Sequence, residues 1–153
     1  MPLCWATKPP TATVPSVGKE RAERQTPIRD MLDRHIIDCA GSDFGGPNPD
    51  EALPNNPFKF FYYYVTRKTN DGMLLGPQEK ISRAEALRLF TVNSAYATFE
   101  EKVKGSIKAG KLADFVILSQ DVMTVPDDKI LATRALATYV GGRRVFSAEN
   151  TNF

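Results

Sequence analysis

The segment 105-GSIKAGKLADFVIL-118 decides the fold class of this sequence. Gly105 and Gly110 mark two turns, and Leu112–Leu118 is an apolar run of the length of a β-strand. Asp114 interrupts this run, so we expect it to act as a cap or to form an ion pair with Lys111 or with an arginine of the strands that follow. The segment therefore predicts a strand that is entered through a tight turn.

The sequence after this strand predicts a β-rich end to the chain. Ser119–Lys129 is polar and contains a proline, which indicates an excursion between strands. Ala135–Phe146 then has the pattern of a strand, a Gly141-Gly142 turn and a second strand, which is the spacing of a two-residue hairpin. We expect strands within residues 100–146 and a frayed tail in residues 147–153.

Helical patterns occupy much of the sequence before residue 100. Apolar residues at helical spacing predict a helix from Thr26, as N-cap, to about Arg34. The clearest helix is predicted over Ile81–Phe99, where Ser82 and Glu85 have the spacing of a capping box. Asn93 interrupts the apolar stripe of this helix, which predicts a hydrogen bond to a neighbouring backbone group.

A short apolar stretch, Ile36–Ala40, predicts a strand that ends at Gly41-Ser42-Asp43. Ligands of α/β proteins gather at the carboxyl ends of strands, so Asp43 is at the edge where a site would form. Phe44–Pro57 is rich in glycine, proline and asparagine and predicts a loop that could shape such a site. On the residues alone, Gly-Ser-Asp is also an ordinary turn sequence.

Three stretches resemble, in order, the C-terminal end of the composite-domain metal-dependent amidohydrolases. The stretches are TVNSAYATFEEKVKGSIKAGKLADFVIL at Thr91–Leu118, LSQDVMTVP at Leu118–Pro126 and LATYVGGRRVF at Leu136–Phe146. Within that group the sequence is most similar to amidohydrolase family 3, in its N-substituted formamide deformylase-like branch. The resemblance runs from about Gly18 to Phe146 and is specific for the family rather than for a substrate.

This resemblance implies an α/β fold built from parts of two larger units. Residues 18–99 would form the last β/α units of a (β/α)8 barrel, and residues 100–146 would form closing strands of a small composite β-sandwich, after an irregular arm in residues 1–17. A whole barrel takes about 250 residues. Because the sequence has 153 residues, we expect the barrel to be incomplete.

The same resemblance implies that Asp43 is a metal ligand and a catalytic residue. In this setting an aspartate at the end of the eighth barrel strand binds a divalent metal, expected to be zinc, and accepts a proton from the attacking water. The reaction would be the hydrolysis of a non-peptide C–N bond in a small amide or formamide.

The histidine content departs from the family pattern. Enzymes of this family use several histidines, whereas this sequence has one, His35, which we interpret as exposed or hydrogen-bonded elsewhere. One carboxylate cannot hold zinc. We therefore expect that this chain does not hold the metal alone and is inactive alone.

Two alternatives explain the missing histidines. The chain could be a non-catalytic binding module or subunit built on the amidohydrolase scaffold, or part of a split enzyme in which a complementing chain supplies the histidines. In either case a partial barrel and a partial sandwich leave unpaired edges and apolar faces, so we expect a homo-oligomer, a complementing chain or marginal stability.

The aromatic run Phe58–Tyr64 has helical spacing and precedes Arg67 and Lys68. Such a run could be a stacking platform for single-stranded nucleic acid, and without the rest of a barrel wall its rings could stay exposed. The net charge of +2 argues against both nucleic acid and an anionic membrane as partners. A helix that packs against a barrel wall is the favoured interpretation.

Cysteine content and hydropathy bear on the compartment. Cys4 and Cys39 do not make a disulfide framework, and the first residues lack the pattern of a secretory signal. No apolar run approaches the roughly 20 residues of a membrane span. We expect a reducing, cytoplasmic setting, with Cys39 buried and unreactive.

Overall fold

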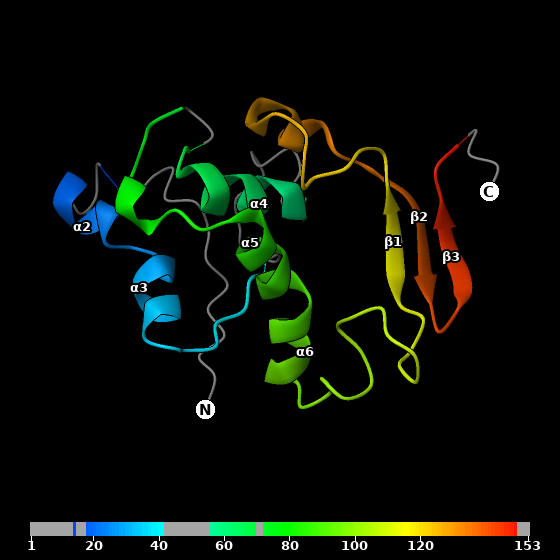
Figure 1. Cartoon of the computed structure of the whole chain (residues 1–153). Coiled ribbons are helices and arrows are strands. Elements are labelled where there is room, and N and C mark those ends of the chain that lie inside the picture. Colours follow the sequence, from blue (N-terminus) through cyan, green and yellow to red (C-terminus); the bar gives the residue numbers. More distant parts are fainter. Residues whose placement is uncertain (1–13, 15–17, 42–55, 70–71, 150–153) are drawn as a thin grey trace.

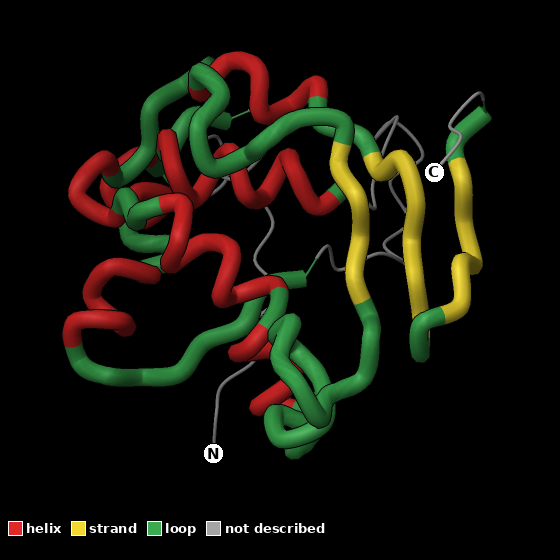
Figure 2. Tube along the Cα trace, turned by 45° about the vertical axis from the view of Figure 1, so that its right-hand side comes forward, coloured by secondary structure: helices red, strands yellow, loops and turns green. Residues whose placement is uncertain are grey.

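The computed structural model describes residues 14, 18–41, 56–69 and 72–149, and it places a group of short helices beside a small sheet (Figure 1). Figure 2 shows the same division from a second direction, with the sheet to one side of the helices. Apart from Val14, the predicted arm of residues 1–17 lies outside the described residues, as do Ser42, Asp43 and most of the predicted loop.

The first helices are short, and the cap of the second comes from a distant residue. Helix α2 spans Lys19–Glu23 and helix α3 spans Ile28–Asp33. The prediction that Thr26 is the N-cap is wrong, because Thr26 has a φ of 63° and Pro27 precedes the first helical residue.

The carboxylate of Glu79, at the end of the 3-10 helix η1 (Pro77–Glu79), takes the place of that cap. It accepts hydrogen bonds from the backbone amides of Arg29, at 2.8 Å, and Asp30, at 3.2 Å. These are two of the amides that a helix leaves without partners in its first turn. A helix pattern in the sequence cannot reveal a cap that lies fifty residues away.

Helix α4 (Pro57–Thr66) contains the aromatic run and is buried in the core. Its first turn is capped by Asn56, whose side chain accepts a hydrogen bond from the Phe58 amide at 2.9 Å. Residues of α3, α4 and α5, the position two residues before α5, and the segment after β1 form the hydrophobic core: Ile28, Phe60, Phe61, Tyr63, Tyr64, Ile81, Ala86, Leu89, Val122 and Ile130. Since the central rings of the run are buried, the stacking-platform hypothesis and the expectation of exposed rings are wrong.

The predicted helix Ile81–Phe99 consists of two helices, α5 (Arg83–Phe90) and α6 (Val92–Ala97). They are separated at Thr91, whose dihedral angles of φ −124° and ψ −90° are not helical. The sequence has no glycine or proline at this point. Two consecutive β-branched residues, Thr91 and Val92, are modest helix formers, and the loop at Gly105 packs closely against them.

The predicted capping box at the start of α5 is confirmed and extended by a neighbouring helix. Ser82 accepts a hydrogen bond from the Glu85 amide, and the Glu85 carboxylate accepts one from the Ser82 amide at 2.8 Å. Glu85 also binds the guanidinium of Arg29 on α3, with an N–O distance of 2.9 Å. Burial opposes ionisation of Glu85, but the hydrogen bonds from Ser82 and Arg29 outweigh it and lower the pKa of this carboxyl group.

Replacing Glu85 by glutamine is expected to reduce the free energy of unfolding by about 1 kcal/mol at neutral pH. Because the pKa of Glu85 is lowered in the folded state, its ionic contribution is present above the unfolded pKa of about 4.3 and is lost as the pH falls through the folded value. Denaturant unfolding at pH 7 and in acid measures the free energy of unfolding of the wild-type chain and of Glu85→Gln. The difference between the two free energies should be smaller in acid than at pH 7. Glu20→Gln, at an exposed position of α2, is the control, and an equal effect of the two substitutions would contradict this account.

The sheet has three antiparallel strands within the described residues, in the order β1 (Phe115–Leu118), β2 (Ala135–Val140) and β3 (Arg143–Ser147). The hairpin between β2 and β3 is confirmed: Gly141 and Gly142 have φ values of 56° and 76°, as a two-residue primed turn requires. Strand β1 begins three residues later than predicted.

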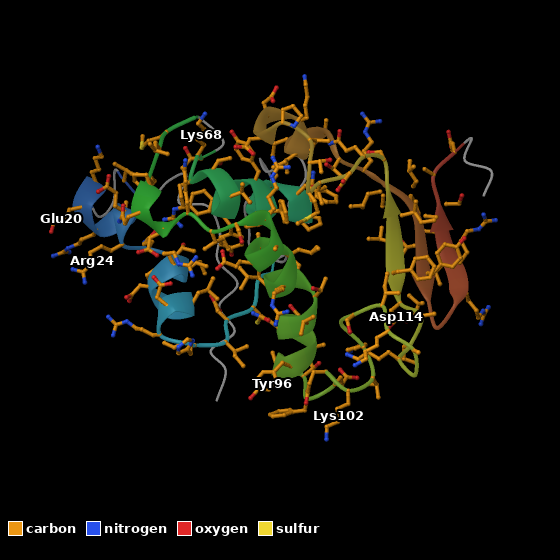
Figure 3. The ribbon with its side chains drawn as sticks, in the orientation of Figure 1. Glu20, Arg24, Lys68, Tyr96, Lys102 and Asp114 are labelled. Atoms are coloured by element: carbon orange, nitrogen blue, oxygen red, sulfur yellow. The ribbon has the colours of Figure 1, made fainter. Side chains whose placement is uncertain are left out.

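Asp114 joins the start of β1 to this turn (Figure 3). Its carboxylate accepts a hydrogen bond from the Gly141 amide at 2.7 Å, and the Ala113 carbonyl accepts one from the Gly142 amide. The prediction that Asp114 acts as a cap is confirmed. Beside it, the rings of Phe115 and Tyr139 stack with centroids 4.5 Å apart.

The segment between β1 and β2 attaches the sheet to the helices. It contains the 3-10 helix η2 (Asp127–Ala132) and places Val122 and Ile130 in the core. Arg83 at the start of α5 donates to the Val122 carbonyl at 2.9 Å and to the Asp127 carboxylate at 2.6 Å. The sheet itself adds little to the core.

Candidate functional site

Residues 36–41 lead to the predicted ligand Asp43, and two helices hold them in place. The Ala40 amide donates to the Leu89 carbonyl of α5 at 3.1 Å. Asn93 of α6 is nearly buried and donates through Nδ2 to the Asp38 carbonyl at 2.7 Å. The prediction that Asn93 bonds to a neighbouring backbone is confirmed, and α5 and α6 position this segment.

The segment is not the strand that its sequence predicts. Within Ile36–Ala40, only Cys39 takes part in a β-bridge. A strand needs a neighbouring strand to pair with its backbone groups. Here the Leu89 carbonyl of α5 bonds to the Ala40 amide, and the Asn93 side chain of α6 bonds to the Asp38 carbonyl. The prediction of a strand is therefore wrong for this chain, although the segment ends, as predicted, just before Asp43.

Asp43 lies outside the residues that the structure describes, so its metal-binding and catalytic roles remain predictions. Over residues 18–41, 56–69 and 72–149, no group of three or more His, Cys, Asp or Glu side chains could hold a metal ion. The described residues thus do not fit a complete metal site.

His35 and Cys39 do not contribute to such a group. His35 is exposed just after α3, with a φ of 59°, as the exposed interpretation predicts. The Cys39 thiol is not in a disulfide, and the residue is half-buried rather than fully buried.

Arg67, which follows the aromatic run and was part of the stacking-platform alternative, is fully buried. Its guanidinium donates to the carbonyls of Leu75 at 2.9 Å, Thr26 at 3.1 Å and Gln25 at 3.3 Å. It also lies 4.5 Å from the centre of the Tyr63 ring. Burial lowers the pKa of Arg67. No sequence signal distinguishes this arginine from an exposed one, and its contacts are structural.

Comparison with protein families identifies the chain. The model of the amidohydrolase family matches residues 3–146, which is nearly the whole sequence. The chain belongs to the amidohydrolase family. This confirms the resemblance seen in the sequence and makes it a member of a family of hydrolases.

Curated relatives support the same assignment. The chain is 33% identical over 116 residues to an N-substituted formamide deformylase of Arthrobacter pascens, covering 76% of this chain and 20% of that protein. It is 43% identical over 131 residues to Protein LONG AFTER FAR-RED 3 of Arabidopsis thaliana, covering 85% and 21%. A putative amidohydrolase, YtcJ, of Bacillus subtilis is 28% identical over 133 residues, covering 85% and 24%. The chain thus spans a fifth to a quarter of the length of these relatives.

Among solved structures, an amidohydrolase from Thermotoga maritima MSB8 is 18% identical to the chain. The alignment covers 86% of this chain and 36% of the Thermotoga chain, with a TM-score of 0.41.

In the part of the chain that the structure describes, no helix has the length and apolar character needed to cross a membrane.

Proposed function

We propose that this chain is the part of a metal-dependent amidohydrolase that supplies Asp43 to the metal centre. The assembled enzyme hydrolyses non-peptide C–N bonds in small amides or formamides. The observation that carries the proposal is the family match over residues 3–146, which includes the Gly41-Ser42-Asp43 sequence. The N-substituted formamide deformylase relative supports the substrate class.

The order of helices and strands along the chain supports the proposal that its two parts belong to two different units of a larger fold. Residues 18–99, which hold the helices α2 to α6, would complete a (β/α)8 barrel, and residues 100–146 would contribute strands to a composite β-sandwich. The observed change from helices to sheet falls between Ala97 and Phe115, close to the proposed boundary. Residues 1–17 would be an arm. The predicted tail of residues 147–153 is wrong at its start, because Ser147 ends β3 and the Ala148 amide donates to the Leu136 carbonyl.

The metal is proposed to be a divalent ion, zinc by preference, held jointly with residues from outside this chain. A zinc site needs at least three protein ligands, and the described residues hold no such group. The sequence has one histidine, and His35 is exposed. The remaining ligands would come from a complementing chain or from further sequence like that of the relatives, so the 153 residues alone should be inactive.

A graft into the deformylase tests the proposal. Residues 18–146 of this chain replace the matching segment of the Arthrobacter protein, and hydrolysis of an N-substituted formamide is followed. We expect activity in the graft, and we expect Asp43→Asn to reduce kcat/KM by about 100-fold or more, because a ligating carboxylate that also moves a proton contributes at least that much.

Asp128→Asn is the matched control, since it removes the same charge at an exposed position of η2. It should leave kcat/KM within about twofold, as expected for a substitution outside the site. A graft that remains folded and equally active with asparagine at position 43 would contradict the proposed role of Asp43.

A non-catalytic binding module on the amidohydrolase scaffold is the second candidate. The single, exposed histidine favours it, because the family chemistry needs several. A folded graft that retains Asp43 but neither binds metal nor hydrolyses formamide would favour this candidate over the first.

A further inference from the structure

Two groups at the junction of α5 and α6 bind the same short stretch of chain. The Leu89 carbonyl lies in the last turn of α5, where a helix leaves its carbonyls without helical partners. It accepts a hydrogen bond from the Ala40 amide at 3.1 Å. Asn93, the second residue of α6, donates through Nδ2 to the Asp38 carbonyl at 2.7 Å. The break between the two helices thus brings two helix ends to this stretch, which runs from α3 to the junction (Figure 1).

The stretch from Asp38 to Ala40 is held at two different residues, so both its position and its direction are fixed. The side chain of Asn93 is nearly buried, and Asp38 is 1% exposed. Water therefore does not readily take the place of the Asn93 amide, and removal of that amide costs the Asp38 carbonyl a donor. Asn93 is the side chain on which the order of this stretch depends.

The part of α6 that carries Asn93 is itself closely packed. A Cβ added at Gly105 would lie 2.7 Å from the Ala95 Cβ and 3.1 Å from the Val92 Cα, so the loop after α6 packs against residues that flank Asn93 in the sequence. In the other helix, Leu89 is fully buried in the core. Both groups that hold the stretch thus belong to well-packed parts of the fold, as the supporting residues of a site must.

This support bears on Asp43, because Asp43 follows Gly41 by two residues. Two residues span at most about 7 Å of chain, so the direction of residues 38–41 limits where the Asp43 carboxylate can lie. We propose that Asn93 is a positioning residue for Asp43: its amide fixes the backbone from which Asp43 extends. The inference rests on the proposed function, and it goes further by naming the side chain that supports the proposed catalytic residue.

The kinetics of the deformylase graft test this role. Asn93→Leu keeps the branched shape of the side chain but removes the donor. We expect kcat to fall about tenfold or more and KM to stay within about twofold, because a displaced carboxylate affects the transition state rather than substrate binding. Asn93→Asp should have a similar effect, since its carboxylate cannot donate to a carbonyl. A wild-type kcat in either folded variant would overturn the proposal.

Two controls separate positioning from stability. Thr98 donates through Oγ1 to the Ala95 carbonyl at 3.1 Å, so Thr98→Val removes a hydrogen bond to α6 itself. Glu85→Gln weakens the cap of α5. Both should leave kcat within about twofold. Equal losses of kcat in Glu85→Gln and Asn93→Leu, compared at the same fraction of folded protein, would show that reduced stability causes the effect and would refute the positioning role.

Hydrogen exchange of the Ala40 amide gives a readout that does not depend on activity. In the 153-residue chain this amide should exchange at least about tenfold more slowly than in an unstructured peptide. Asn93→Leu should remove most of this protection, although the Leu89 carbonyl remains, and Thr98→Val should retain it. An Ala40 amide that is unprotected in the wild-type chain, or equally protected in Asn93→Leu, would overturn the proposal even if no variant of the graft folds.

The two proposals can fail separately. If the wild-type graft is inactive while exchange at Ala40 depends on Asn93, the support of this stretch stands and the proposed function fails. If the graft is active and its activity depends on Asp43 but not on Asn93, the proposed function stands and the positioning role of Asn93 fails.

Discussion

Replacing Gly105 by alanine is expected to lower the free energy of unfolding by about 3 kcal/mol. Gly105 has a φ of 86°, and a Cβ added there would lie 2.7 Å from the Ala95 Cβ and 3.1 Å from both the Thr91 carbonyl oxygen and the Val92 Cα. Two of these three atoms belong to the backbone of the α5–α6 junction, which cannot move aside as a flexible side chain can. The loop that leads to β1 should therefore detach from α6.

Gly110→Ala is a closely matched control for this substitution. Gly110 has the same φ of 86°, but a Cβ there would meet nothing within 4 Å. It should show only the cost of the left-handed backbone, about 1 kcal/mol. Urea unfolding of both variants measures the difference. If the two variants lose the same stability, the close packing of Gly105 on α6 is not present in solution.

The second large effect is expected at Arg67. Replacing it by alanine should cost about 4 kcal/mol, because a buried side chain is lost and the carbonyls that it reaches lose a donor. Among these carbonyls, that of Thr26 keeps the Ile28 amide as a second donor. Those carbonyls belong to Gln25, Thr26 and Leu75, so the substitution should loosen α2 and α3 from the end of α4. Thermal unfolding followed by circular dichroism measures the loss.

Lys68→Ala is the control for Arg67, since it removes a positive charge from the next position at an exposed side chain (Figure 3). Its effect should stay within about 0.5 kcal/mol. Arg67→Lys separates charge from geometry: an ammonium keeps the charge but cannot reach three separated carbonyls as a planar guanidinium does. Full stability of Arg67→Lys would show that charge alone matters, against the structure.

Features with local causes could be predicted from the sequence. The capping box at Ser82 and Glu85, the Gly141-Gly142 turn and the helical spacing of the aromatic run each depend on residues close together in the chain, and each is found in the structure. The hydrogen bond of Asn93 is predictable because a polar residue in an apolar stripe needs a partner. Family membership was recognisable because the resemblance covers most of the chain.

Features that depend on distant partners could not be predicted. The cap of α3 comes from Glu79, and the break at Thr91 is packed against the loop at Gly105. Arg67 has the sequence context of a surface cation, yet three carbonyls from two other segments surround it. The prediction of a strand at Ile36–Ala40 is wrong for a related reason. A strand forms only where neighbouring strands pair with it, and the local sequence does not show whether they are present.

The number of metal ions that the protein binds shows whether Asp43 of this chain completes a metal centre. After dialysis against a buffer whose only divalent metal is a trace of zinc, mass spectrometry counts the divalent ions bound by the 153-residue chain, by the deformylase graft and by the graft with Asp43→Ala. We expect no retained ion in the chain alone, a stoichiometric ion in the graft and its loss with Asp43→Ala. A stoichiometric ion in the chain alone, or one retained in the Asp43→Ala graft, would contradict this expectation.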